Sequence, residues 1–120
     1  MDGRACVLIV DDEERNRTLI RVTLRDHYRT LEAEHGTAAL ELLQRELVDL
    51  VLLDVMMPGM TGFEVCKRVK EMHRDSFLPV LLITALSDQE QKNLGLQAGA
   101  DDFLAKPVDR RELLLRVRAF

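Results

Sequence analysis

Five short apolar runs alternate along this chain with segments whose apolar residues recur at helical spacing. The three strongest runs lie at residues 6–10, 50–53 and 80–83, are rich in branched side chains, and end at polar or turn-forming residues. Two weaker runs lie at residues 28–33 and 100–105. A strongly apolar run of this length is typical of a strand buried on both faces of a parallel sheet. Strands that alternate with helices predict an α/β fold, in which right-handed crossovers place helices on both faces of that sheet.

The segments that follow the strands predict helices with one apolar face each. The acids at residues 11–14 are expected to open the first helix, because negative charge favours the positive end of a helix dipole. Residues 87–90 match a capping box for the fourth helix, which is expected to end near Gly99, and Asp109 is expected to cap the fifth. The predicted stripes are Asn16, Ile20 and Leu24; Ala39, Leu40, Leu43 and Leu47; Phe63, Cys66 and Val69; and Leu113, Leu114 and Val117. At 120 residues, we expect one doubly wound, three-layer α/β domain over residues 1–120.

Composition excludes several classes of partner. A net charge of −4 argues against non-specific nucleic-acid binding, which requires a basic face. No apolar stretch approaches the ~20 residues that a membrane helix needs. The two cysteines, Cys6 and Cys66, lack metal or redox spacing and are expected to be small buried hydrophobic residues. The resulting expectation is a soluble protein in the reducing cytoplasm, without a nucleic-acid or membrane partner for this domain.

Polar residues follow the predicted strands at the point where each strand ends. Asp11 and Asp12 follow the first strand, and Asp54, Thr84 and Lys106 close the third, fourth and fifth. The carboxyl ends of parallel strands meet at one edge of the sheet, where open α/β folds bind their ligands. We therefore expect these five side chains to meet in one shallow site.

The chemistry of these residue types is that of phosphoryl transfer. Three neighbouring carboxylates repel one another unless a cation is present, and hard oxygen ligands suit Mg²⁺ or Mn²⁺. A carboxylate can act as a nucleophile and form an aspartyl-phosphate. Metal, lysine and hydroxyl together neutralise the charge on a transferred phosphoryl group.

Four separated motifs carry a resemblance to a known family: VDDE at residues 10–13, LDVMMPGMTG at 53–62, ITA at 83–85 and FLAKP at 103–107. In this order they strongly resemble the receiver domain of bacterial two-component response regulators. The resemblance covers essentially the whole chain. It implies a flavodoxin-like (βα)5 fold with strand order 2-1-3-4-5.

The resemblance implies a role for each site residue. Asp54 matches the phosphoacceptor, Asp12 the direct metal ligand, and Asp11 the acid that holds the metal through water. Asp54 itself also matches a metal ligand, and Met56 matches the position whose backbone carbonyl completes the metal shell.

The resemblance also implies a switch. Thr84 matches the hydroxyl that turns toward the phosphoryl group, and Lys106 matches the lysine paired with the phosphoacceptor. Phe103 matches the aromatic switch residue; because it has no hydroxyl, burial of its ring would have to carry the switch. The bond between Lys106 and Pro107 matches one that is cis in this family.

The implied function is a phosphoacceptor switch and not an enzyme with an external substrate. A sensor histidine kinase or phosphotransfer protein would phosphorylate Asp54, and the surface of the fourth helix, fifth strand and fifth helix would then change to control an output domain or partner. Asp101, Asp102, Arg110 and Arg111 are expected on or near that surface, where ion pairs could support a homodimer. The residues of these motifs look most like those of receivers attached to cyclic-di-nucleotide enzymes or to kinases. We therefore expect an output domain beyond this chain.

Two apolar residues near the predicted site indicate slow loss of the phosphoryl group. Met56 lies two residues after the phosphoacceptor, and Leu86 lies two after Thr84. Polar side chains at these positions can orient a hydrolytic water, and neither residue is polar here.

Three other functions share part of this pattern. A pseudo-receiver would keep the fold as an interaction module without phosphorylation, but it is expected to lack an acid or the lysine. Enzymes of the haloacid dehalogenase type use an aspartyl nucleophile with Mg²⁺, but need a second aspartate at the position that Met56 occupies here. A flavodoxin needs a Ser/Thr-rich phosphate loop, and the acids at residues 11–14 would repel phosphate unless a cation intervened.

Overall fold

The computed structural model describes residues 3–85 and 89–120 and contains five strands and five helices in strict alternation. In chain order they are β1 (Cys6–Val10), α1 (Glu14–Leu24), β2 (Arg29–Ala33), α2 (Gly36–Arg45), β3 (Leu50–Asp54), α3 (Gly62–Met72), β4 (Val80–Thr84), α4 (Gln89–Gln97), β5 (Asp102–Ala105) and α5 (Arg110–Arg118). The predicted α/β alternation is confirmed.

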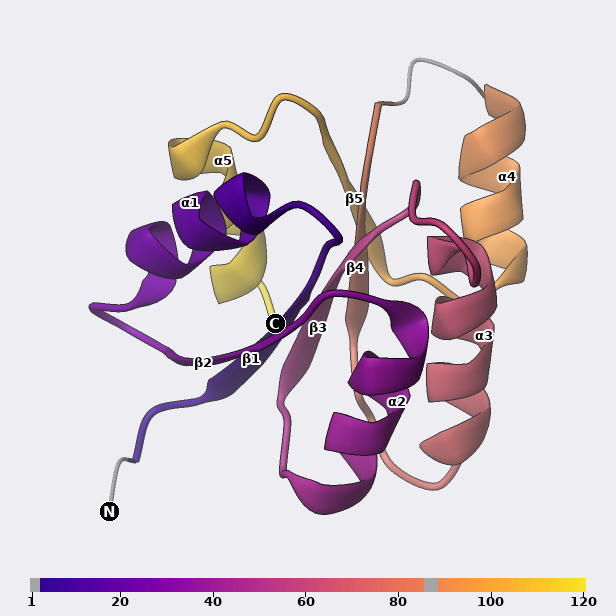
Figure 1. Cartoon of the computed structure of the whole chain (residues 1–120), viewed down its shortest axis with the longest axis horizontal. Helices are drawn as coiled ribbons and strands as arrows, with labels where there is room; N and C mark the ends of the chain where they lie inside the picture. Colours follow the sequence, from indigo (N-terminus) through magenta and orange to yellow (C-terminus); the bar gives the residue numbers. More distant parts are fainter. Residues whose placement is uncertain (1–2, 86–88) are drawn as a thin grey trace.

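The strands form one parallel sheet in the order β2-β1-β3-β4-β5, which confirms the order that the resemblance implies. Helices α1 and α5 cover one face of the sheet, and α2, α3 and α4 cover the other (Figure 1). Every residue of β1, β3 and β4 is buried, as expected for central strands covered on both sides. The edge strands β2 and β5 are only partly buried.

Two aliphatic clusters, one on each face, form the core. The larger packs β1, β3 and β4 against α2 and α3, and the smaller packs the opposite faces of these strands against α1 and α5. Cys6 and Cys66 are both buried and carry free thiols, which confirms their reading as small hydrophobic residues. Burial raises the pKa of the Cys66 thiol to about 11, so it remains protonated at neutral pH.

Several helix ends are fixed by local hydrogen bonds. Thr61 and Glu64 form a capping box at the start of α3, and Asp109 caps α5 by accepting the Glu112 amide at 2.9 Å, as predicted. His35 caps α2 through Nδ1, which accepts the Ala38 amide at 3.1 Å. The capping box predicted at residues 87–90 begins at Ser87 and Asp88, which lie outside the described residues.

Two local predictions were wrong. Asp11 and Asp12 do not open α1, because Glu13, the residue before the helix, is extended and the helix begins at Glu14. Leu47 does not continue the apolar stripe of α2, because Glu46 adopts an extended conformation and ends the helix at Arg45. Leu47 is consequently 91% exposed.

The register of the sheet aligns the carboxyl ends of its strands. Val10 lies opposite both Ala33 and Leu53, while Asp54 pairs with Ile83 and Thr84 with Ala105. The residues that directly follow or close these strands therefore share one edge. Among residues 3–85 and 89–120, no helix is both long and apolar enough to span a membrane.

Candidate functional site

Asp54 ends β3 and is almost completely buried, with 1% of its surface exposed. Its Oδ1 accepts the Lys106 ammonium at 2.8 Å and the Met56 amide at 3.2 Å. Its Oδ2 is buried and has no hydrogen-bond partner among the residues that the structure describes. A buried carboxylate oxygen without a partner is costly, so this atom is expected to have a ligand in the working protein.

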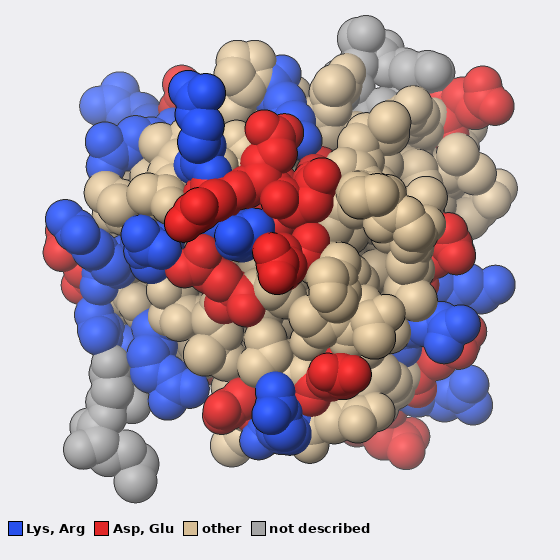
Figure 2. Space-filling view, in the orientation of Figure 1, with Lys and Arg blue, Asp and Glu red and all other residues tan. Residues whose placement is uncertain are grey.

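Asp11 and Asp12 lie beside Asp54, and carboxylate oxygens of the three acids lie within 4.8 Å of one another. Asp11 is buried and its Oδ1 accepts the Glu13 amide at 2.9 Å, whereas Asp12 is exposed. Acidic side chains gather near the centre of the molecule's face in Figure 2, with basic atoms between them. The structure therefore brings together the three acids and the lysine that the sequence singles out.

The pKa of Asp11 reflects its burial and the charges around it. Burial raises the pKa of this carboxyl above its ordinary value, and the negative charge of Asp54 adds to the increase. Hydrogen bonds from the Glu13 amide and the Asn16 side chain, with the charge of Lys106, offset only part of it. Burial and the charge of Asp54 thus both disfavour the ionised form of Asp11.

Lys106 places a positive charge beside the acids, because its ammonium contacts Asp54. Burial acts to lower the pKa of its ammonium, but the hydrogen bond to Asp54 and the surrounding acidic charge raise that pKa above its ordinary value. Its backbone amide donates to the Thr84 carbonyl at 2.8 Å, which holds the end of β5 against β4. The bond from Lys106 to Pro107 is cis, the configuration that the resemblance implies.

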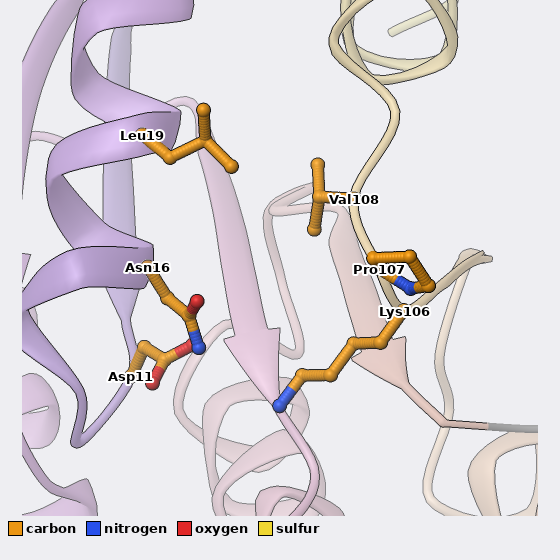
Figure 3. A pocket seen from close by; sticks show the side chains of 6 residues that line it. All are labelled: Asp11, Asn16, Leu19, Lys106, Pro107 and Val108. Atoms are coloured by element: carbon orange, nitrogen blue, oxygen red, sulfur yellow. The ribbon is translucent and has the colours of Figure 1, made fainter.

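A depression of about 400 Å³ opens beside the acids, between α1 and the segment that joins β5 to α5 (Figure 3). Polar groups of Asp11, Asn16 and Lys106 lie at one end of it, and Leu19, Pro107 and Val108 give it apolar walls. The depression therefore gives solvent access to Asp11 and Lys106 and has an apolar wall beside them.

Thr84 closes β4, and Phe103 lies in the neighbouring strand β5. Thr84 is buried, and its hydroxyl has no hydrogen-bond partner within the described part of the chain. The partly buried ring of Phe103 lies against Gly95 of α4, where an added Cβ would stand 2.5 Å from Phe103 Cε1. Both residues line a second depression of about 280 Å³, together with Lys92, Glu112 and Arg116. Thr84 and Phe103 thus border the same depression.

Met56 is 67% exposed, so an apolar side chain stands in solvent two residues after the end of β3. Leu86, the other apolar residue from which slow loss of a phosphoryl group is predicted, lies outside the described residues.

Comparison with known proteins decides the family. The family model of the response regulator receiver domain matches residues 7–118 of this chain. The chain belongs to this family.

Individual relatives agree with this assignment. The receiver is 45% identical over 116 residues to response regulator PleD of Caulobacter vibrioides, and 40% identical over 115 residues to histidine kinase P4 of Formosa agariphila. Each match covers 96% of this chain, but only 26% of PleD and 8% of P4. The chain thus spans a small part of these two relatives.

Solved structures match the receiver along its whole length. Chemotaxis protein CheY4 of Vibrio cholerae superposes with a TM-score of 0.92 at 36% identity, covering 98% of each chain. Receivers of this family are phosphoacceptor signalling domains of two-component systems, and this chain is one of them.

The charged residues expected near the receiver's output surface are mostly paired within the chain. Asp101 contacts Lys70 Nζ at 2.5 Å, and Asp102 contacts Arg116 at 2.9 Å. Arg110 Nε donates to the Thr23 hydroxyl at 2.9 Å. A homodimer that used these groups would have to exchange internal contacts for external ones.

Sequence reasoning missed two residues beside the acids. Asn16 donates to Asp11 and lines the depression of Figure 3, and Arg17 donates to the Asp11 carbonyl at 2.7 Å. The signal for Asn16 was a polar residue on the apolar stripe that contains Ile20 and Leu24. Arg17 gave no such signal, because it lies on α1 and its partner Glu32 lies 15 positions away on β2.

Proposed function

We propose that this receiver accepts a phosphoryl group on Asp54 with the help of a divalent cation, and that the modification changes the surface formed by α4, β5 and α5. The observation that carries the proposal is the asymmetric setting of the Asp54 carboxylate. One oxygen is held by Lys106 and the Met56 amide, and the other is buried without a partner in the described chain. A nucleophilic oxygen needs this combination of fixed orientation and a free lone pair.

The donor set fits Mg²⁺ or Mn²⁺. Asp12 and Asp54 would bind the cation directly, Asp11 would hold it through water, and the Met56 carbonyl would complete the protein ligands. Three carboxylates with oxygens within 4.8 Å of one another suit a hard cation, whose charge would offset the repulsion between them. When bound, the cation would neutralise charge on the transferred phosphoryl group.

The phosphodonor would be a phosphohistidine on a sensor kinase or phosphotransfer protein. Its imidazole ring could rest against the apolar walls of the depression in Figure 3, with the phosphoryl group toward Lys106. Asp54 Oδ2 would form a bond to phosphorus while the phosphorus–nitrogen bond breaks, and the imidazole would leave with that electron pair. Lys106 would stabilise the charge on the phosphoryl oxygens.

The switch would begin at Thr84. Its buried hydroxyl lacks a partner in the described chain, so a phosphoryl oxygen on Asp54 would offer an acceptor for it. Movement of Thr84 would alter the depression that it shares with Phe103, into which the ring could turn. The surface around Lys92, Glu112 and Arg116 would change as a result, which is a shift of population between two packings.

We propose that this surface controls an output domain or a partner in the cytoplasm. One relative is itself named as a histidine kinase and contains the matching segment in 8% of its length. That arrangement supports an output domain in the same polypeptide, either a kinase or a cyclic-di-nucleotide enzyme. The same surface of α4, β5 and α5 would also serve a homodimer. The negative net charge is in keeping with protein partners for this domain and not nucleic acid.

The test is phosphorylation by acetyl phosphate, a small donor that needs no cognate kinase. Wild type, Asp54→Asn and Asp75→Asn are incubated with Mg²⁺ or with a chelator, and the phosphorylated fraction is measured by intact mass and on phosphate-affinity gels. We expect wild type and Asp75→Asn to be labelled only with Mg²⁺, and Asp54→Asn to remain unlabelled. Asp75 is a suitable control because it is an exposed aspartate in the segment between α3 and β4.

Beryllofluoride extends the test to the switch, because it mimics the phosphoryl group without chemistry. Amide spectra should then change along α4, β5 and α5 in wild type and not in Asp54→Asn. Absence of labelling and of spectral change in wild type would contradict the proposal and favour an interaction module without phosphorylation.

A further inference from the structure

Arg17 links the acid-bearing segment after β1 to the edge strand β2. It lies on the first turn of α1, and only 13% of its side chain is exposed. Its Nη1 donates to the Asp11 carbonyl at 2.7 Å, and its Nε donates to Glu32 Oε1 at 3.2 Å. A planar guanidinium can serve both acceptors at once, which a lysine ammonium cannot do with the same fixed geometry.

Asp11 is held from three sides. Its amide donates to the Ala33 carbonyl at 3.1 Å, its Oδ1 accepts the Glu13 amide at 2.9 Å, and its carbonyl accepts Arg17. The first two bonds fix the residue's amide and side chain, but neither fixes the peptide group that follows. Because a peptide group is planar, the direction of the Asp11 carbonyl sets the orientation of the Asp12 amide.

Asp12 has the greatest need of such support. It is exposed, whereas Asp11 and Asp54 are buried, and its carboxylate completes the three-acid cluster. Repulsion from the other two carboxylates acts to turn it toward solvent. Its place in the cluster therefore depends on the backbone that carries it.

We propose that Arg17 is a positioning residue for the cation site, and that Glu32 of β2 holds it in place. The inference rests on the proposed role of the acids in binding Mg²⁺. Groups that orient metal ligands without touching the metal contribute about 10- to 100-fold to metal affinity in other proteins. Arg17 would act in this way through the peptide group between Asp11 and Asp12.

Arg21 provides a matched control. Its Nη1 donates to the other oxygen of the same carboxylate, Glu32 Oε2, at 2.7 Å, and no contact to Asp11 accompanies this bond among the interactions described for it. Arg17→Met and Arg21→Met each remove one cation and one bond to Glu32 while keeping an unbranched side chain that suits a helix. Only Arg17→Met releases the Asp11 carbonyl.

The experiment measures Mg²⁺ affinity by calorimetry and stability by urea unfolding in wild type and both variants. We expect Arg17→Met to weaken Mg²⁺ binding by about tenfold and Arg21→Met by less than about twofold. A purely electrostatic effect has the opposite sign, because removing a cation near three carboxylates favours binding of another cation. Unchanged or tighter binding in Arg17→Met, or equal losses in the two variants, would overturn the proposal.

A measurement on wild type protects the test against a variant that does not fold. The Nε–H resonance of Arg17 should shift on titration with Mg²⁺, and that of Arg21 should stay in place. An Arg17 resonance that does not respond while Mg²⁺ binds would contradict the positioning role. If wild type binds no Mg²⁺ at all, it is the proposed function of the acids that fails.

Discussion

Asp54 combines deep burial with a negative charge, and one lysine accounts for most of its support inside the protein. Lys106 lies 2.8 Å from Oδ1 while the other oxygen has no partner in the described chain. Removing one member of a buried ion pair costs more than removing both, because the remaining charge loses its compensation. Asp54 and Lys106 should therefore be strongly coupled in stability.

A double-mutant cycle measures this coupling. We expect Lys106→Met to lower the free energy of unfolding by about 2–3 kcal/mol without divalent cations, somewhat less than for a fully buried pair because Lys106 is partly exposed. Asp54→Asn should restore most of the loss in the Lys106→Met background. Urea unfolding at pH 7 provides the values, with Lys67→Met on the exposed side of α3 as a control for loss of a lysine. A double mutant no more stable than Lys106→Met would show that the pair is not coupled.

Met56 presents an apolar side chain to solvent two residues after Asp54, the proposed phosphoacceptor. Its side chain is 67% exposed and cannot orient a water molecule for attack on a phosphoryl group. We predict that Met56→Asn speeds loss of the phosphoryl group from Asp54 by between about twofold and about tenfold, the rate equivalent of one hydrogen bond worth ~0.5–1.5 kcal/mol. The measurement follows the phosphorylated fraction after removal of acetyl phosphate in the presence of Mg²⁺.

Met56→Leu is the control for that rate, because it changes the side chain and keeps it apolar. Its phosphoryl lifetime should match that of wild type. A Met56→Asn protein that loses phosphoryl no faster than Met56→Leu would refute the role of this position.

Strands and helices were predicted from the sequence where one signal dominated. The apolar runs of β1, β3 and β4 predicted strands correctly. These strands are buried on both faces, so their residues are almost all apolar and stand out from the flanking polar segments. Helix ends were less accurate: Leu47 continues the spacing of α2, but the backbone at Glu46 is extended and ends the helix first. The strand order came from the resemblance, since spacing alone does not determine which strands are neighbours.

Packing between α4 and β5 depends on a missing side chain. Gly95 is buried in α4, and an added Cβ would lie 2.5 Å from Cε1 and 2.8 Å from Cζ of Phe103. Gly95→Ala should gain up to about 1 kcal/mol of helix propensity but lose about 1–3 kcal/mol to overpacking. We therefore expect it to destabilise the protein or to displace the Phe103 ring.

The two effects separate in a second background. In Phe103→Leu, which removes the two nearest ring atoms and leaves Leu82 Cδ1 at 3.0 Å from the added Cβ, Gly95→Ala should destabilise less than in wild type, as measured by urea unfolding. Ring resonances of Phe103 should shift in Gly95→Ala alone. Stabilisation by Gly95→Ala in the presence of Phe103 would contradict the contact and with it the restraint that α4 places on the ring.

Across the chain, the residues of the site come from different strands and meet only because the sheet aligns their carboxyl ends. Asp11, Asp54, Thr84 and Lys106 could be predicted because each interrupts or closes an apolar run. Arg17 and Asn16 could not be identified as supports, because their roles depend on how α1 sits against β2 and the depression. Sequence patterns thus identify groups that disturb burial, and they miss groups whose importance comes from tertiary contacts.

Because the three acids destabilise one another in the folded state, a cation that binds them should stabilise the whole domain. A ligand that binds only the folded state adds RT ln(1 + [L]/Kd) to the free energy of unfolding. This is about 2.7 kcal/mol when the ligand concentration is about a hundred times Kd. We expect the urea midpoint of wild type to rise with Mg²⁺ concentration, and Asp12→Asn to lose most of the increase while Asp75→Asn keeps it. The comparison is made at constant ionic strength with NaCl, because salt alone also weakens repulsion between exposed charges. A midpoint that responds equally to Mg²⁺ and to matched NaCl would mean that the cluster responds only to general screening, and Asp11, Asp12 and Asp54 would then have no role as a cation site.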